Sequence, residues 1–340
     1  HIMHTPEEGK VRVAFAELID LASEKVGGKA LVANDEFFAP KENLLKPGRG
    51  VFIPDKYTEF GKWMDGWETR RKRVPGYDWC ILQLGLPGVI RGVNVDTHHF
   101  LGNFPEYASV DALEVSGTPT PESLTEAAWT EVVPRTKLAG GTQNFLPVAS
   151  ERRWTHVRLN IYPDGGVARF RVHGVVQPDL AKLRASEGVD LAAAENGGIV
   201  VTCNDSFFGP KDNLILPGRA VTMGEGWETR RKRVPGFDWI VVKLAAPGTV
   251  QRVEVDTNHF KGNFPDMCSL EGCSLKEDLL DFANAKDISW QEILPKTKLQ
   301  AHHRHFFEAE LKAAGPFTHV RLNIFPDGGI SRLRIHGRVS

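Results

Sequence analysis

Apolar and polar residues alternate with a period of two through much of the chain, as they do in half-buried β-strands. The alternation is clearest at the end of each half, where Val157, Leu159 and Ile161 are separated by polar residues and the turn sequence PDGG follows. A proline followed closely by two glycines that tolerate positive φ suits a short turn. The pattern therefore predicts a β-hairpin over 155–174 and a second over 318–337.

Further strands are expected where short apolar runs stand between glycine and proline turns. In the first half these runs lie at 29–34, 77–84, 89–96, 107–115 and 130–134, and the second half has counterparts. Helices are expected only over 14–26 and 189–196, each followed by two glycines. Seven or eight short strands in each half, with so little helix, indicate an all-β fold built of antiparallel jelly-roll β-sandwiches.

The two halves of the chain are copies of each other. The segment GWETRRKRVPGYDW at 66–79 returns at 226–239 with one substitution. The segment DTHHFLGNFP at 96–105 returns as DTNHFKGNFP at 256–265. A long internal repeat of this kind indicates duplicated domains rather than an array of small solenoid units.

The repeat also sets the expected domain boundaries. We expect a first jelly-roll repeat over 11–176, a second over 188–339, and a linker over 177–187. The motif NDEFFAPKENLL stands farther from GWETRRKR than its copy NDSFFGPKDNLI does. The first repeat therefore carries an insertion of about ten residues around IPDKYTEFGKWM, within the length that surface loops tolerate.

Charge and composition exclude several classes of partner. The 340 residues carry 42 Lys and Arg against 43 Asp and Glu, so there is no overall field to attract nucleic acid or anionic lipid. No apolar run reaches the roughly 18 residues of a membrane-spanning helix, and the N-terminus has no secretory signal pattern. We expect a cytoplasmic protein, away from membranes, whose four cysteines are reduced because they form no CxxC pair.

The run ETRRKR holds the densest group of charged side chains in the repeats. The residues concerned are Glu68, Arg71 and Arg73 in the first copy and Glu228, Arg231 and Arg233 in the second. A solvated basic surface is an equally good interpretation of the run alone, and the lack of interleaved aromatic residues argues against nucleic acid. A guanidinium held by the glutamate would bind a small carboxylate, at about 1.5–3 kcal/mol for each charge-assisted hydrogen bond. The run thus indicates a small anionic ligand.

A second repeated cluster follows two of the predicted strands. Asp96 precedes His99, and Asp256 precedes His259. A carboxylate beside an imidazole suits acid–base chemistry, because imidazole titrates near neutrality and the carboxylate orients it. The structural alternative is that the aspartate caps a turn and the histidine packs against the next phenylalanine. A metal site is disfavoured, because Asn258 replaces one histidine of the first copy.

Two further positions accompany these clusters. Asn103 and Asn263, in the motif GNFP, would either orient a polar substrate or shape their loop. His305 stands in TKLQAHHRHFF where the first copy has Asn144, so the two halves need not be chemically equal. The histidines of this segment would bind a metal or, as is commoner for loop histidines, simply be solvated.

In the long blocks that contain GWETRRKRVPGYDW and DTHHFLGNFP, preceded by NDEFFAPKENLLKPGR, the chain resembles the allantoicase family over residues 11–339. The resemblance implies two tandem jelly-roll domains, similar to galactose-binding or discoidin-like modules. It also implies hydrolysis of allantoate to ureidoglycolate and urea in purine degradation, by a homo-oligomer. The sequence requires no cofactor, and dependence on a divalent metal stays open.

The implied substrate is a small anion with one carboxylate and two ureido groups. The substrate-binding candidates are Arg71, Arg73, Asn103, Arg231, Arg233 and Asn263. The general acid would be His259 or His305, and the base Asp256 or Glu228. The equivalents in the first copy are Glu68, Asp96 and His99. We favour the second repeat, and attack on either the central carbon or a ureido carbonyl stays open.

A non-catalytic function is the main alternative. Jelly-roll modules also serve as carbohydrate-binding or other small-ligand domains, and a fold does not determine a function. An inactive regulatory relative is a further possibility. Release of urea from allantoate would distinguish an active enzyme from a binding protein and from an inactive relative.

Overall fold

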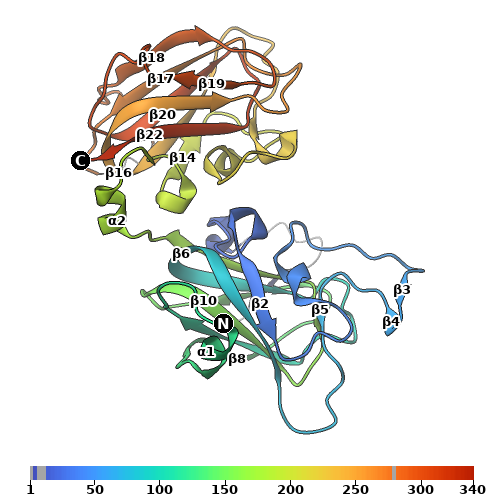
Figure 1. Ribbon diagram of the computed structural model, residues 1–340. Coiled ribbons are helices and arrows are strands. Elements are labelled where there is room, and N and C mark those ends of the chain that lie inside the picture. Colours follow the sequence, from blue (N-terminus) through green and yellow to red (C-terminus); the bar gives the residue numbers. More distant parts are fainter. Residues whose placement is uncertain (1–2, 6–12, 278–280) are drawn as a thin grey trace. The chain divides into compact units, whose positions relative to one another are not determined.

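The computed structural model describes residues 3–5, 13–277 and 281–340 (Figure 1). The chain divides into two compact units, His1–Gln177 and Pro178–Ser340, and each is a β-sandwich with a few short helices. No helix among the described residues is long and apolar enough to cross a membrane. The all-β tandem fold expected from the alternation and the duplication is confirmed.

The first unit is built almost entirely of strands. They are β1 (Met3–Thr5), β2 (Lys29–Ala33), β3 (Tyr57–Thr58), β4 (Gly61–Lys62), β5 (Trp67–Glu68), β6 (Asp78–Asp96), β7 (Tyr107–Leu113), β8 (Thr130–Lys137), β9 (Gln143–Pro147), β10 (Arg153–Tyr162), β11 (Gly166–Val167) and β12 (Arg169–Val176). The helical segments are the 3₁₀ turns η1 (Ala14–Glu17), η2 (Glu24–Val26) and η3 (Lys41–Leu45) and the α-helix α1 (Pro121–Glu126).

The second unit repeats this order. Its strands are β13 (Val189–Asp190), β14 (Ile199–Cys203), β15 (Trp227–Glu228), β16 (Asp238–Asp256), β17 (Met267–Cys273), β18 (Gln291–Lys298), β19 (Arg304–Phe307), β20 (Phe317–Phe325), β21 (Gly329–Ile330) and β22 (Arg332–Val339). Its helical segments are α2 (Leu180–Ala185), η4 (Ala194–Asn196), η5 (Lys211–Ile215) and η6 (Met223–Glu225). The segment 177–187, expected as a linker, contains α2.

One long strand connects the two sheets of each unit. The first half of β6 pairs with β2 and β10, and its second half pairs with β9 and β12. β7 and β8 extend the first of these sheets. In the second unit, β16 pairs in the same way with β14 and β20 and then with β19 and β22. The two strands predicted at 77–84 and 89–96 are therefore the two halves of β6.

The predicted hairpins over 155–174 and 318–337 are wrong. The strands themselves are present, but β10 pairs with β6 and β7, while β12 pairs with the other half of β6. The PDGG turn therefore crosses from one sheet to the other. Alternation reports which side chains face the core, and it does not select the partner strand.

The core lies between the inward faces of the two sheets. In the second unit Val253 and Val255 of β16 and Leu333 and Ile335 of β22 are fully buried. Each such side chain contributes about 1.5–3 kcal/mol on burial. Trp227 is also fully buried, and its Nε1–H donates to a main-chain carbonyl at 2.9 Å. The tryptophan of the repeated WETRRK motif is thus part of the core.

The helices predicted over 14–26 and 189–196 are wrong as continuous helices. The first segment is two 3₁₀ turns separated by a β-bridge at Asp20, and the second begins as a strand and ends in one 3₁₀ turn. Each still ends at the predicted glycine, with φ of 98° at Gly27 and 107° at Gly197. The glycine pairs correctly indicated where the helical turns end.

The insertion in the first repeat forms a projecting arm, defined here as residues 50–64. It contains the short ladder β3–β4 and extends away from the sheets of the first unit (Figure 1). Val51, Tyr57 and Phe60 are exposed on it. The second unit has only residues 220–224 at this position.

Candidate active site at the loop end of each unit

Both ends of β6 reach the same end of the first sandwich. The strands that pair with those ends, β10 and β12, are joined by only the short segment 163–168. The two repeated motifs meet on this segment, because Thr69 N donates to Gly165 O at 3.0 Å and Gly166 N donates to Asn103 O at 2.8 Å. The second unit repeats both bonds, at 3.0 and 2.9 Å. We call this region the loop end of each unit.

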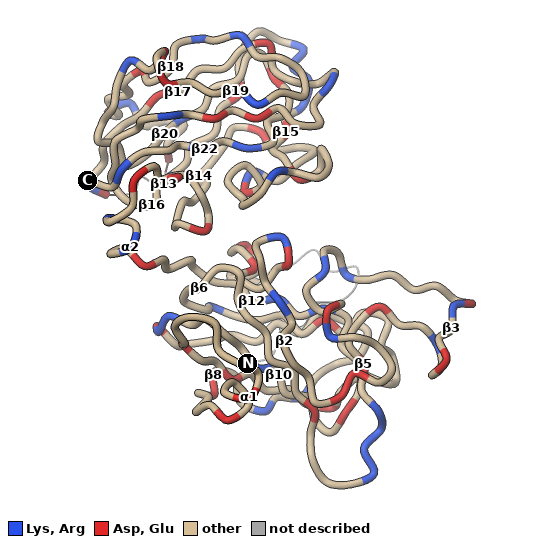
Figure 2. The backbone as a smooth tube through the Cα atoms, in the orientation of Figure 1, with Lys and Arg blue, Asp and Glu red and all other residues tan. Residues whose placement is uncertain are grey.

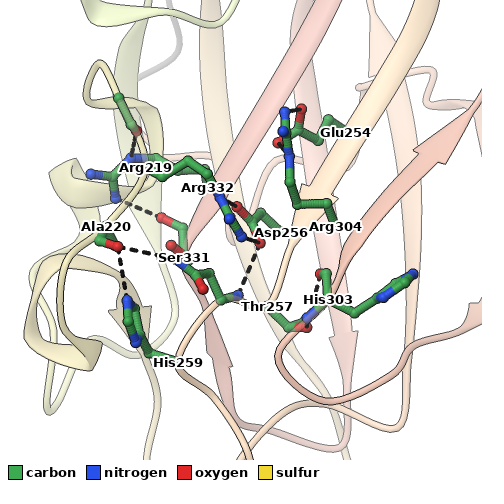
Figure 3. Close-up of polar contacts among 12 residues, drawn as sticks. Arg219, Ala220, Glu254, Asp256, Thr257, His259, His303, Arg304, Ser331 and Arg332 are labelled. Carbon is green, nitrogen blue, oxygen red and sulfur yellow. Dashed lines mark hydrogen bonds and ion pairs between the residues drawn. The ribbon is translucent and has the colours of Figure 1, made fainter.

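At the loop end of the second unit, Asp256 is fully buried and bonded to an arginine that lies far from it in sequence (Figure 3). Arg219 donates from Nε and Nη2 to the two carboxylate oxygens at 3.0 and 3.2 Å. In the first unit, Arg49 holds Asp96 at 2.9 and 3.1 Å. Neither arginine is among the candidates expected from the sequence, although both follow the repeated sequence PG.

The loop that carries Arg219, residues 216–226, is fastened to the sheet by two arginines of β22. Arg332 Nε and Arg334 Nη2 both donate to Gly218 O, at 3.0 and 2.8 Å. Arg332 is buried, and burial, reinforced by the charge of Arg334, lowers its pKa to about 10. Its guanidinium still carries a full charge at neutral pH.

His259 lies under the same loop in a strained backbone conformation. Its Nε2 is 2.9 Å from Ala220 O, and because a carbonyl only accepts, Nε2 must carry the proton. Its main-chain N donates to His302 Nδ1 at 2.8 Å. Among the described residues other than glycine, only His99, His259 and His302 have positive φ. Strain of this kind is concentrated at functional sites.

Glu228 of β15 bonds to loop 257–264. It accepts a hydrogen bond from Asn263 Nδ2, which also lies 3.7 Å from Met223 Sδ. Loop 216–226 therefore touches loop 257–264 through Ala220 and through Met223. His259 makes the first of these contacts, and the bonding partner of Glu228 makes the second.

The equivalent pair in the first unit is Glu68 with Asn103, whose Nδ2 donates at 2.8 Å. Burial raises the pKa of Glu68, and the Asn103 bond offsets this only in part. A carboxyl group with a raised pKa exchanges protons more readily near neutrality.

The structure does not assemble the predicted arginine clamp. Arg71, Arg73, Arg231 and Arg233 are all exposed, and no contact described for them reaches Asp96 or Asp256. Figure 2 shows the cationic run between β5 and β6 projecting beyond the sheets. The inward cations are instead lysines: Lys72 pairs with buried Asp78 at 2.7 Å, and Lys232 with Asp238 at 2.8 Å.

His305 uses both of its ring nitrogens in hydrogen bonds to the main chain, so neither is left to act as an acid. It is buried, Gln300 N donates to its Nε2 at 2.8 Å, and its Nδ1 donates to Val255 O at 2.9 Å. Burial lowers its pKa. Asn144 makes the corresponding bonds in the first unit, accepting from Ala139 N and donating to a strand carbonyl. Asn144 and His305 therefore make equivalent structural hydrogen bonds in the two repeats.

Among the described residues, no group of three or more His, Cys, Asp or Glu side chains is arranged to hold an ion. In the cluster of His302, His303 and His305, the first accepts from the main chain and the last has both nitrogens bonded. The four cysteines are free, and burial raises the pKa of Cys268 to about 12.

Known proteins are similar to this chain over almost its whole length. The family model described as Allantoicase repeat matches twice, over residues 19–177 and 189–340. "Probable allantoicase 1" of Burkholderia mallei is 52% identical over 94% of this chain and 94% of its own length. "Probable allantoicase" of Pseudomonas aeruginosa is 46% identical over 95% of this chain and 96% of its own.

Solved structures agree with the sequence relatives. A structure of allantoicase superposes with a TM-score of 0.77 at 35% identity, covering 94% of this chain and 93% of that one. The crystal structure of allantoicase from Saccharomyces cerevisiae gives a TM-score of 0.78 at 33% identity, covering 99% of this chain and all of that one. The chain described here belongs to the allantoicase family.

Proposed function

We infer that this protein hydrolyses allantoate to ureidoglycolate and urea in purine degradation. The observation that carries this inference is family membership over almost the full length of the chain. Both repeats match the family model, and a relative named as an allantoicase is 52% identical over 94% of the chain.

The products determine which bond breaks. Urea leaves with both of its nitrogens and its carbonyl, so the bond between the central carbon and a ureido nitrogen is broken, and the oxygen of water is added to that carbon. Attack on a ureido carbonyl would instead leave an amine on the central carbon and release carbamate. The site therefore has to protonate the departing nitrogen and take a proton from water.

We propose His259 as the group that protonates the leaving urea. Its Nε2–H is committed to Ala220 O, so Nδ1 is the nitrogen left to exchange a proton. Glu228, half-buried beside Asn263, is our candidate for the base that activates water. Positioned proton transfer contributes roughly 10²- to 10⁴-fold to a rate.

We assign substrate binding to side chains on the same two loops. The side chain of Arg219 is 48% exposed, and two of its nitrogens are fixed on Asp256, so its remaining N–H groups are held ready for the substrate carboxylate. Asn263 would orient a ureido group. Asp256 is fully buried and already accepts from Arg219 and from Asn258 N, which supports a positioning role.

We further propose a cytoplasmic homo-oligomer that needs no cofactor. Free cysteines fit a reducing compartment. The exposed apolar side chains of the arm, such as Val51, Tyr57 and Phe60, are the kind of surface that a partner subunit covers. Proton transfer by side chains is sufficient chemistry for the reaction.

The test is the release of urea from allantoate by the purified protein, with and without a chelator. Release that survives chelation supports the proposal as stated. Release that is lost with the chelator and restored by a divalent metal would contradict the cofactor-free mechanism. Absence of urea under both conditions would leave the alternative of a small-ligand or carbohydrate-binding protein.

A further inference from the structure

One histidine of the second unit adopts a backbone conformation for which the first unit uses glycine. His302 lies in loop 299–303, between β18 and β19, with a φ of 47°. Its counterpart in the first repeat is Gly141, with a φ of 65°. A side chain at positive φ costs free energy that glycine avoids. The second unit therefore carries a strained residue at a place where the first unit does not.

The shape of the loop does not explain this histidine. In both units the main-chain N of the threonine that follows the long strand, Thr97 or Thr257, donates to this loop at 2.9 Å. The main-chain N of Gly141 and that of His302 likewise both donate to a phenylalanine carbonyl at 3.0 Å. These bonds hold the loop in the same way with a glycine or with a histidine.

What the imidazole of His302 adds is a bond to His259. Its Nδ1 accepts a hydrogen bond from the main-chain N of His259 at 2.8 Å, and the two ring centroids are 5.6 Å apart. An accepting ring nitrogen carries no proton, so the bond requires the neutral imidazole of His302. Gly141 has no side chain that could make the corresponding bond to His99.

His259 is thereby held from two sides. Its ring Nε2 donates to Ala220 O at 2.9 Å, and its main-chain N donates to His302 (Figure 3). Its φ is 72°, in a region that residues other than glycine rarely adopt. The bond to His302 is made in this conformation and therefore favours it over the extended alternatives. The direction in which Nδ1 of His259 points depends on the same backbone conformation.

We propose that His302 is a positioning residue, which fixes the backbone of His259 and so directs Nδ1 of that histidine toward the substrate. The strain at His302 is then offset by a role that the second unit has and the first lacks. The inference rests on the proposed function for the part that His259 plays in turnover. The bond between the two histidines can be measured without turnover.

Steady-state kinetics of urea release test the role in turnover. H302G should lower kcat by about tenfold, because His259 loses one of its two anchors. It should change KM by less than about threefold, because the bonds of Arg219 and Asn263 stay in place. Gly141 shows that glycine suits this backbone, and thermal melts check that the variant is folded.

H302N is the variant expected to rescue activity. Asparagine tolerates positive φ, and its Oδ1 is attached to the same Cγ atom as Nδ1 of histidine, so it can accept the same bond. We expect kcat within about threefold of that of the unchanged protein, since proton transfer by His302 is not required. H303N makes the same substitution at the next position and serves as the matched control, with kcat unchanged.

A double-mutant cycle shows whether His302 acts through His259. H259N already lacks the imidazole that His302 positions, so the addition of H302G should lower kcat by less than about threefold. A further tenfold loss would mean that His302 acts independently of His259, and would overturn the inference. A folded H302G with unchanged kcat would overturn it as well. If H302G does not fold, a folded H302N that has lost about tenfold or more in kcat decides against the inference.

Hydrogen exchange at the main-chain N–H of His259 tests the bond whether or not urea is released. Mass spectrometry of peptides that contain this residue, after labelling of the full chain, should show exchange at least about threefold faster in H302G, and unchanged in H302N and H303N. Equal exchange in H302G and the unchanged protein would remove the inference and leave the function. Faster exchange in a protein that releases no urea would support the positioning of His259 and remove the proposed function.

Discussion

Arg219 and Asp256 form an ion pair in which two guanidinium nitrogens meet the two carboxylate oxygens at 3.0 and 3.2 Å. The carboxylate is buried, whereas half of the arginine side chain faces solvent. An arginine held in this way can present its remaining N–H groups in a fixed direction. Its side chain therefore loses little conformational entropy when a ligand binds.

Replacement of Asp256 by asparagine should therefore weaken substrate binding. We expect D256N to raise KM for allantoate by about tenfold and to lose about 1–3 kcal/mol of stability. The reason is that asparagine offers Arg219 one acceptor oxygen and no negative charge. Steady-state kinetics and a urea melt measure the two effects. The matched control is D96N in the first unit, which should lose similar stability and keep its KM. Equal loss of activity in both variants would contradict the assignment to the second unit.

His259 should supply a proton during turnover. We expect H259N to lower kcat by roughly 10²- to 10³-fold, because the asparagine side chain cannot exchange a proton in place of the imidazole. Asparagine is the suitable replacement because it tolerates the positive φ of this position. H99N makes the same change in the first unit and should keep kcat within about threefold. A kcat of H259N within about threefold of that of the unchanged protein would rule out its role in proton transfer.

His305 should make the protein less stable in acid. Burial lowers its pKa, so the unfolded chain binds the proton first as the pH falls. The stability that His305 contributes is complete above pH of about 6.5 and is lost progressively below it, down to the depressed pKa of the folded state. Denaturant melts between pH 5 and pH 8 record this slope.

H305N supplies the control for that slope, because Asn144 already makes the same bonds in the first unit. We expect H305N to fold, to keep its activity, and to have a weaker dependence of stability on pH. Some dependence should remain, because burial also lowers the pKa of His156. An unchanged slope would show that His305 does not titrate as the structure indicates.

Lys232 should stabilise the cationic loop between β15 and β16, whereas the neighbouring Arg231 should not. Its Nζ lies 2.8 Å from Asp238, which is fully buried. K232M leaves that carboxylate without its cation and should cost about 3–5 kcal/mol. R231M alters an exposed side chain and should change stability by less than about 0.5 kcal/mol. Similar melting curves for the two variants would refute the inward position of Lys232.

Local patterns and the comparison of the two repeats were enough to predict several features of this protein. Alternation around Val157 and Leu159 located the strands, because a strand with one buried face must alternate. The duplication gave the two sandwiches, and the repeated blocks identified the family. The glycines at 27 and 197 marked where helical turns end, because they accept the positive φ required there.

The partners that these segments meet follow from the folded arrangement of the sheets and could not be predicted. Alternation cannot show that β10 and β12 belong to different sheets, or that Lys72 rather than Arg71 points inward. Arg219 and Asp256 lie 37 positions apart in sequence, and no local pattern joins them. Asp65 fills the fork of Arg169 only because the fold brings the base of the arm to β12. Contacts between distant residues depend on how the sheets close, and that closure is a property of the whole chain.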